Sequence, residues 1–141
     1  MELLDMPGHL IRRLQQQSSQ VFQKQVQAAG WDLTPVQFAA INALSTNPGI
    51  DQAQIAAIIG YDRATIGGVI DRLEQKGIVA RIVSRHDRRA REVSLTKKGA
   101  IVLARMRPIV SNLQADILVG LTAKERTRLL SLVRKTLGVE K

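Results

Sequence analysis

The sequence predicts a mainly α-helical protein with one small β-hairpin. Apolar residues recur at helical spacing in six segments, which are separated by glycines, prolines and capping residues. Only residues 78–95 are rich in β-branched residues, and the centre of this stretch is strongly basic. With 141 residues, of which 45% are hydrophobic, the chain is long enough for one core. We therefore expect a single domain over residues 1–141.

The first two predicted helices have clear boundaries. The first runs from about residue 7 to residue 29, and Gly30 ends it. Residues Thr34 to Gln37 form a capping box with proline at the first helical position, so the second helix begins there. The sequence Asn47–Pro48–Gly49 ends the second helix.

Two shorter helices are predicted next. Asp51 caps the third helix with Gln54 three residues on, and Gly60 closes it. The fourth helix is expected to run from about Asp62 to Lys76, followed by a C-terminal glycine. Its apolar stripe consists of Ile66, Val69, Ile70 and Leu73.

A basic hairpin follows the fourth helix. Residues 78–83 and 92–95 are predicted to be the two strands, joined by a long basic connection over residues 84–91. Two packed helices followed by such a β-wing are typical of a winged helix-turn-helix lobe. We place this lobe at residues 34–96.

The last two predicted helices extend beyond the winged lobe. A long helix runs from Thr96 to about Val119, and a capping box of Thr122 and Glu125 opens the final one. The helices in 1–30 and 97–141 are longer than a small winged domain needs. Because their apolar stripes need a partner, we expect them to be dimerisation helices of a homodimer.

Composition limits the function classes. Lys and Arg number 21 against 12 Asp and Glu, a net charge of +9, which indicates a polyanionic partner such as nucleic acid, an anionic membrane or an acidic protein. No apolar run approaches the roughly 20 residues of a membrane span, so no membrane partner is expected and the cytoplasm is the expected location. Four scattered aromatic residues do not suggest a single-strand binder.

Enzymatic chemistry is not indicated. The chain has no cysteine, only two histidines in separate segments, and no glycine-rich phosphate loop. We therefore expect no catalysis, no metal site and no cofactor.

The fourth helix has the features of a DNA reader. Two consecutive helical glycines each cost about 1 kcal/mol relative to alanine, so their presence suggests a close approach to another surface. Small residues would let the helix enter a major groove, where Arg63 and Thr65 could contact bases or phosphates. The alternative is that the glycines only admit a neighbouring helix. The DNA-binding residues predicted in this segment are Arg63, Ala64, Thr65, Gly67, Gly68 and Arg72.

The hairpin concentrates positive charge. Residues 81–98 carry seven positive and two negative side chains, a net +5 in eighteen residues. Arginines at a hairpin tip are suited to the minor groove, where the negative potential is high. We expect Asp87 to pair with a neighbouring arginine and hold the tip in shape. The alternative is a loose charged loop. The DNA-binding residues predicted here are Arg85, Arg88, Arg89 and Arg91.

Three motifs together resemble the MarR family of bacterial transcription regulators over nearly the whole chain. These are Leu33–Phe38, Tyr61–Leu73, and Gly77–Val79 leading to the sequence Asp87–Arg88–Arg89. The resemblance implies a homodimer with two winged lobes that read a pseudo-palindromic operator in double-stranded DNA. It also implies repression relieved by a small ligand. The chain is most similar to members that control the breakdown of aromatic or heteroaromatic acids, and the absence of cysteine argues against the peroxide-sensing branch.

The same resemblance suggests an effector pocket between the dimerisation helices and the winged lobe. An arginine could bind a carboxylate bidentately while His9 donates a hydrogen bond. The alternative is that these cations are ordinary surface residues. The predicted ligand-binding residues are His9, Arg12, Arg13, Gln16, Phe38, Ile41 and Ile58.

Two functions therefore follow from the sequence. The first is a dimeric, sequence-specific DNA-binding regulator, expected to be a repressor released by a small aromatic carboxylate. The alternative is a basic winged-helix module that binds protein or the ribosome without operator recognition.

Overall fold

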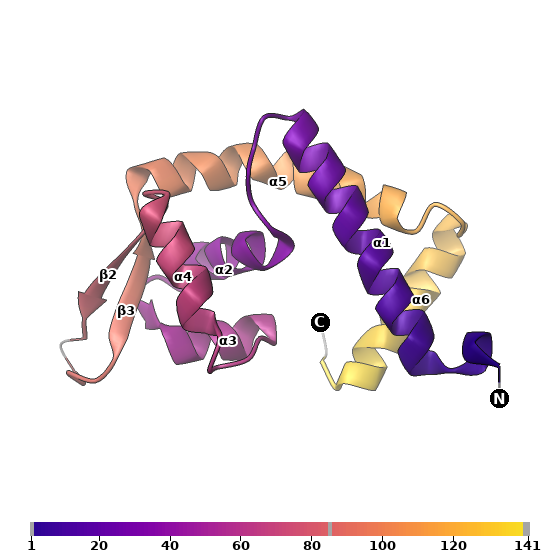
Figure 1. Ribbon diagram of the computed structural model, residues 1–141, viewed down its shortest axis with the longest axis horizontal. Coiled ribbons are helices and arrows are strands. Elements are labelled where there is room, and N and C mark those ends of the chain that lie inside the picture. Colours follow the sequence, from indigo (N-terminus) through magenta and orange to yellow (C-terminus); the bar gives the residue numbers. More distant parts are fainter. Residues whose placement is uncertain (1, 85, 140–141) are drawn as a thin grey trace.

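The computed structural model describes residues 2–84 and 86–139 and shows an elongated molecule (Figure 1). The winged lobe lies at one end, α1 and α6 lie at the other, and the long helix α5 joins them. The elements are η1 (Leu3–Asp5), α1 (Pro7–Ala28), α2 (Pro35–Thr46), β1 (Ile50–Asp51), α3 (Gln52–Ile59), α4 (Ile66–Gln75), β2 (Val79–Val83), β3 (Arg91–Leu95), α5 (Lys97–Ile117) and α6 (Ala123–Leu137). The predicted fold class, mainly α-helical with a winged helix-turn-helix lobe, is confirmed.

The sheet has three antiparallel strands in the order β1-β3-β2. The hairpin of β2 and β3 was predicted, and its register pairs Val79 with Leu95. The third strand was not predicted, since β1 has only two residues, of which Ile50 pairs with Val93. Such a short strand leaves no local pattern in the sequence. The expected two-stranded sheet is therefore corrected to three strands.

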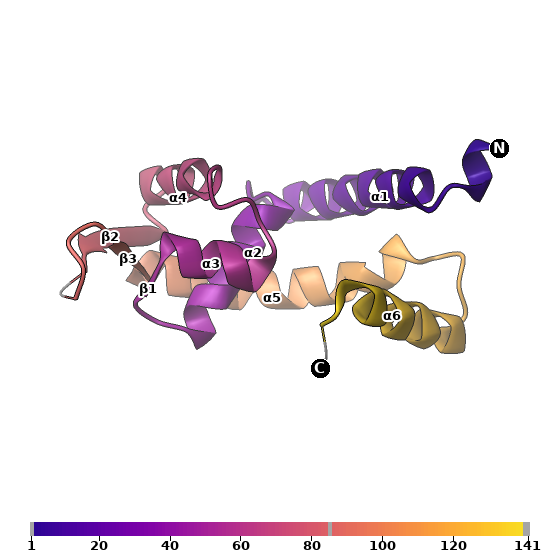
Figure 2. The same ribbon diagram turned by 90° about the horizontal axis from the view of Figure 1, so that it is seen from below.

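The core lies between the sheet and the helices α2, α3, α4 and α5, and α1 adds Phe22 and Val26 to it. Its fully buried side chains include Ile41, Ile70, Leu73, Val93 and Met106. In contrast, α6 contributes no buried residue, and Figure 2 shows it apart from α1 at the same end of the molecule. Within the described residues, none of the helices combines the length and apolarity needed to cross a membrane.

Helix α4 begins later than predicted. The sequence places its start near Asp62, but the helix begins at Ile66, and residues 63–65 form a turn. The Asp62 carboxylate accepts the Ala64 N–H at 2.9 Å, and its carbonyl accepts the N–H groups of Thr65 and Ile66. A short polar side chain that bonds to its own backbone favours a turn over a helix. The helix ends at Gln75, one residue before the predicted end, and Gly77 follows in the left-handed region at φ 73°.

Candidate nucleic-acid interface

The turn before α4 and the outer face of α4 present most of the predicted DNA-binding residues to solvent. Arg63, Ala64 and Thr65 are exposed in the turn, and Gly68 and Arg72 are exposed on the helix. Burial of the apolar stripe of α4 fixes this orientation, because Ile66, Val69, Ile70 and Leu73 all face the core. The structure thus gathers these side chains on one accessible surface. Their roles as DNA contacts stay a prediction.

The two glycines of α4 are not crowded by the protein. A Cβ at Gly67 would lie 3.7 Å from Gln52 Nε2, and one at Gly68 would lie 3.9 Å from Arg72 Nη1. Both distances are ordinary van der Waals contacts, so neither glycine is needed to admit a neighbouring helix. This geometry removes the structural alternative considered from the sequence. Gly68 is exposed, so no side chain at this position of α4 keeps a partner away from the helix backbone.

The wing tip, residues 84–90, is held by short-range hydrogen bonds. The Ser84 hydroxyl accepts the N–H groups of His86 and Asp87 at 3.1 and 3.3 Å. Asp87 Oδ1 accepts the Arg89 N–H at 3.0 Å and lies 3.8 Å from Arg89 Nε. The Ala90 N–H donates to the Asp87 carbonyl at 3.0 Å. Asp87 therefore lies at the centre of the turn, with its carboxylate beside Arg89 as the sequence led us to expect.

A cleft of 530 Å³ separates the wing tip from the turn before α4. Arg63 lines it from the turn, while Arg89 and Arg91 line it from the wing. Arg88 is exposed on the wing tip outside the lining, and Arg85 lies outside the described residues. Cationic side chains from two separate elements thus face one polar cleft, an arrangement suited to a phosphate backbone or groove. The acidic residues Asp51 and Asp87 also line this cleft.

Two cations counted in the basic stretch of the sequence bond to acceptors of the protein itself. Arg81 pairs with Asp71 of α4. Lys98 Nζ donates to the Lys76 carbonyl at 2.8 Å, at the end of α4. Sequence reasoning could not separate these cations from the others in the stretch, because a charge count does not reveal partners in another element.

The predicted ligand-binding residues are not brought together within one chain. Arg12 Nη2 lies 3.5 Å from His9 Nδ1 on α1, while Arg13 and Gln16 line a separate shallow groove along α1. Ile41 is completely buried in the core. Phe38 packs with its ring centroid 6.5 Å from that of Phe22, and Ile58 is exposed on α3. The effector pocket therefore stays a prediction.

A large apolar groove lies on the arms of the molecule, which are α1, the end of α5 and α6. It encloses 750 Å³ between α1, the end of α5 and α6, and its apolar lining includes Ile11, Leu14, Leu130 and Val133. These four side chains are all exposed, at 38–64% of their full area. Apolar side chains gathered in such a groove are typical of a surface that is covered by a partner.

Known proteins share this sequence and architecture. A sequence model of the MarR family matches residues 31–90, from the end of α1 to the wing tip. The HTH-type transcriptional repressor NicR of Pseudomonas putida is 33% identical over 134 residues, which cover 95% of this chain and 84% of NicR.

Two solved structures superimpose closely. BpsR of Bordetella bronchiseptica, solved in a study of how 6-hydroxynicotinic acid regulates its DNA binding, is 28% identical with a TM-score of 0.89 over 99% of both chains. CouR, a transcriptional repressor bound to a 23-mer DNA duplex, is 34% identical with a TM-score of 0.84 over 96% of this chain and 95% of CouR.

Proposed function

This chain belongs to the MarR family and is a DNA-binding transcriptional regulator, and we propose that it acts as a homodimeric repressor released by a small aromatic or heteroaromatic carboxylic acid. The observation that carries the DNA-binding mode is the surface shared by α4 and the wing. Arg63, Arg89 and Arg91 line its cleft, and the two glycines of α4 leave room for a groove. Because the proposed partner is duplex DNA, we place the protein in the cytoplasm.

The proposed homodimer is supported by the arms. Within the described chain, helix α6 has no buried side chain. The apolar side chains of Leu130, Val133 and Leu137 are exposed along it. A second copy offers the same apolar groove, so an isologous interface would cover both surfaces at once. Such a dimer carries two winged lobes, which suit a pseudo-palindrome with half-sites about one helical turn apart.

The proposed effector class rests on the relatives and on cations in α1. BpsR responds to 6-hydroxynicotinic acid, a heteroaromatic carboxylic acid. This chain offers His9, Arg12 and Arg13 on α1, where a carboxylate could be bound. Binding at these residues of α1 would favour a dimer whose α4 helices no longer match successive grooves. Release is then a shift in population between two lobe spacings.

One titration tests DNA recognition and separates it from the alternative. The protein is titrated with the duplex upstream of its own coding sequence and with random duplex, at two salt concentrations. We expect a clear preference for the upstream duplex. Equal affinity for both would favour the alternative, a basic winged-helix module that binds protein or the ribosome without operator recognition.

Two variants test whether the turn before α4 recognises bases. Thr65→Ala and Arg63→Ala remove side chains from the exposed turn before α4 and should reduce the preference for the specific duplex more than the affinity for random duplex. Equal losses on both duplexes would contradict their assignment to base recognition.

A thermal-shift screen tests the effector. The protein is heated with 6-hydroxynicotinate, other aromatic acids, and the matching amides that lack the carboxylate. An effector that binds the folded protein raises its melting temperature, and the rise grows with the ratio of the effector concentration to its Kd. We expect stabilisation by an acid but not by its amide, and loss of that difference in Arg13→Ala or Arg12→Ala. Stabilisation by none of the acids would contradict the proposed class.

A further inference from the structure

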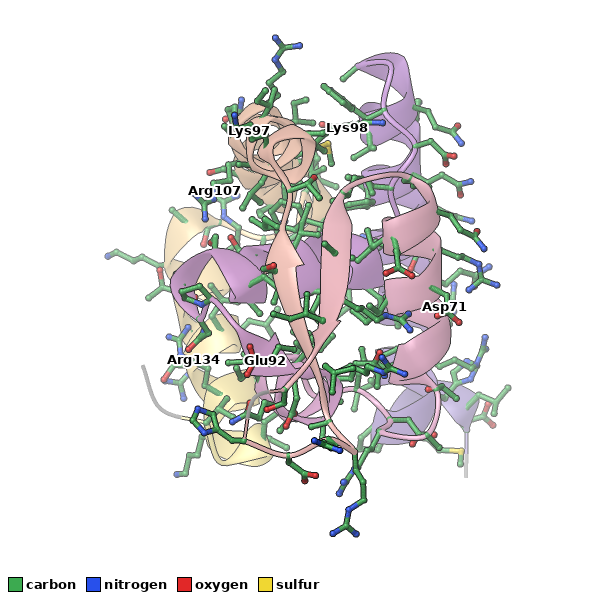
Figure 3. All side chains as sticks on the ribbon, turned by 90° about the vertical axis from the view of Figure 1, so that its left-hand side faces the viewer. Asp71, Glu92, Lys97, Lys98, Arg107 and Arg134 are labelled. Carbon is green, nitrogen blue, oxygen red and sulfur yellow. The ribbon has the colours of Figure 1, made fainter. Side chains whose placement is uncertain are left out.

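A side chain of the wing is bound to the flank of α4. Arg81 of β2 donates from Nη2 to the Asp71 carboxylate of α4 and, at 3.3 Å, to the carbonyl of Gly67. Figure 3 shows Asp71 on α4 at one side of the wing strands, with Glu92 on the other side. One guanidinium therefore bonds to both a side chain and the backbone of the helix proposed to read DNA.

Burial keeps this guanidinium away from an external ligand. The Arg81 side chain is only 20% exposed, and its Nε atom is completely buried. By contrast, the Arg89 side chain on the wing tip is 95% exposed. A phosphate can reach Arg89 without any rearrangement, whereas Arg81 would first have to leave α4. Arg81 and Arg89 are thus placed for different roles, Arg81 toward α4 and Arg89 toward solvent.

The charge of Asp71 gives the contact a second consequence. The Asp71 side chain is 57% exposed and belongs to the helix that also presents Gly68 and Arg72. A free carboxylate on that surface would repel DNA phosphates. Pairing with Arg81 offsets this charge and also fixes the direction in which the carboxylate points.

We infer that Arg81 is a positioning residue for DNA recognition: it sets the orientation of the wing relative to α4, through Asp71 and the Gly67 carbonyl, so that both elements engage the duplex at once. This inference rests on the proposed sequence-specific binding of duplex DNA. It assigns Arg81 no contact with the DNA.

The substitution Arg81→Lys separates positioning from phosphate binding. Lysine keeps the positive charge but lacks the planar fork that reaches two acceptors. If Arg81 only positions the wing, affinity for the specific duplex should fall about tenfold, while affinity for random duplex and the salt slope stay unchanged. If Arg81 binds phosphate, the lysine should retain the affinity for both. Arg105→Lys, at an exposed position on α5, is the matched control.

The Asp71→Asn variant tests the pairing. In the Asp71→Asn background, Arg81→Lys should cost less specific affinity than it does in the parent, since the two residues act through one contact. Equal costs in both backgrounds would overturn the pairing. Asp71 is largely exposed, so this variant is expected to fold even if the change at Arg81 reduces stability.

Hydrogen exchange in the free protein tests the contact without DNA. Arg81→Lys should speed amide exchange in β2 and β3 relative to the core of α5, because the wing loses its attachment to α4. Unchanged exchange would overturn the contact, and faster exchange with unaltered specific affinity would overturn its role in recognition. If the parent protein itself shows no preference among duplexes, the proposed function fails. The hydrogen-exchange result in the free protein then decides by itself whether Arg81 holds the wing against α4.

Discussion

Gly99 near the start of α5 lies directly against the backbone of Ile78, so that a Cβ at residue 99 would overlap the Ile78 carbonyl oxygen. The same junction is tied by Thr96, whose hydroxyl donates to the Gly77 carbonyl at 2.6 Å and accepts the Gly99 N–H at 3.0 Å. The end of α4 and the start of α5 are therefore fixed to each other. This contact positions the winged lobe on the long helix that leads to the arms.

Gly99→Ala should destabilise the fold. The added methyl group meets backbone rather than a flexible side chain, and overpacking of this kind costs about 1–3 kcal/mol of unfolding free energy. Urea denaturation at one protein concentration measures the loss. The control is Gly8→Ala in α1, where nothing lies within 4 Å of the added Cβ. Equal midpoints for the two variants would contradict the close contact.

Gly68→Ala should separate stability from DNA binding. Alanine is favoured over glycine in a helix by up to about 1 kcal/mol, and the new Cβ has room, so unfolding stability should stay equal or rise. The methyl group would nevertheless project from the surface proposed to enter the groove, so affinity for the specific duplex should fall. Denaturation and fluorescence-anisotropy titration check the two effects. Unaltered affinity would show that α4 does not approach DNA closely at Gly68.

Arg89→Ala should weaken binding to every duplex. If the exposed Arg89 neutralises one phosphate, the slope of log K against log salt becomes shallower by about 1. Arg105→Ala, which removes an exposed charge outside the interface, should leave the slope unaltered. The same slope in parent and Arg89→Ala would argue against a phosphate contact.

Much of the helical structure could be predicted from the sequence because its signals are local. The capping boxes at Thr34, Asp51 and Thr122 each use a pair of side chains three residues apart, and all three are present. The late start of α4 was missed because Asp62 bonds to the turn rather than capping a helix. Strand β1 was missed because its pairing partner is more than forty residues away.

The candidate interface was only partly predictable for the same reason. The gathering of Arg63, Arg89 and Arg91 at one cleft follows from how the turn before α4 and the wing lie in space, which sequence spacing does not encode. Likewise, nothing in the local sequence marks Arg81 as the partner of Asp71, ten residues earlier in another element.

The start of α6 should respond to pH. Hydrogen bonds from the Thr122 backbone N–H and then its side chain hold the pKa of Glu125 below its ordinary value. A lowered pKa in the folded state means that the carboxylate stabilises the fold above its unfolded pKa, and that this contribution is lost as pH falls through the folded value. Glu125→Gln should therefore be less stable than the parent at neutral pH, and the two should converge as the pH falls below the folded-state pKa of Glu125. A constant difference in unfolding midpoint would contradict this role.

The most direct test of the account is selection of binding sites from a pool of random duplexes by the intact protein. We predict enrichment of two half-sites related by a dyad, with centres about 10 base pairs apart, because two α4 helices of one dimer read successive major grooves. Retention of DNA with no enriched sequence, or with a single unpaired half-site, would contradict a dimeric operator-binding regulator.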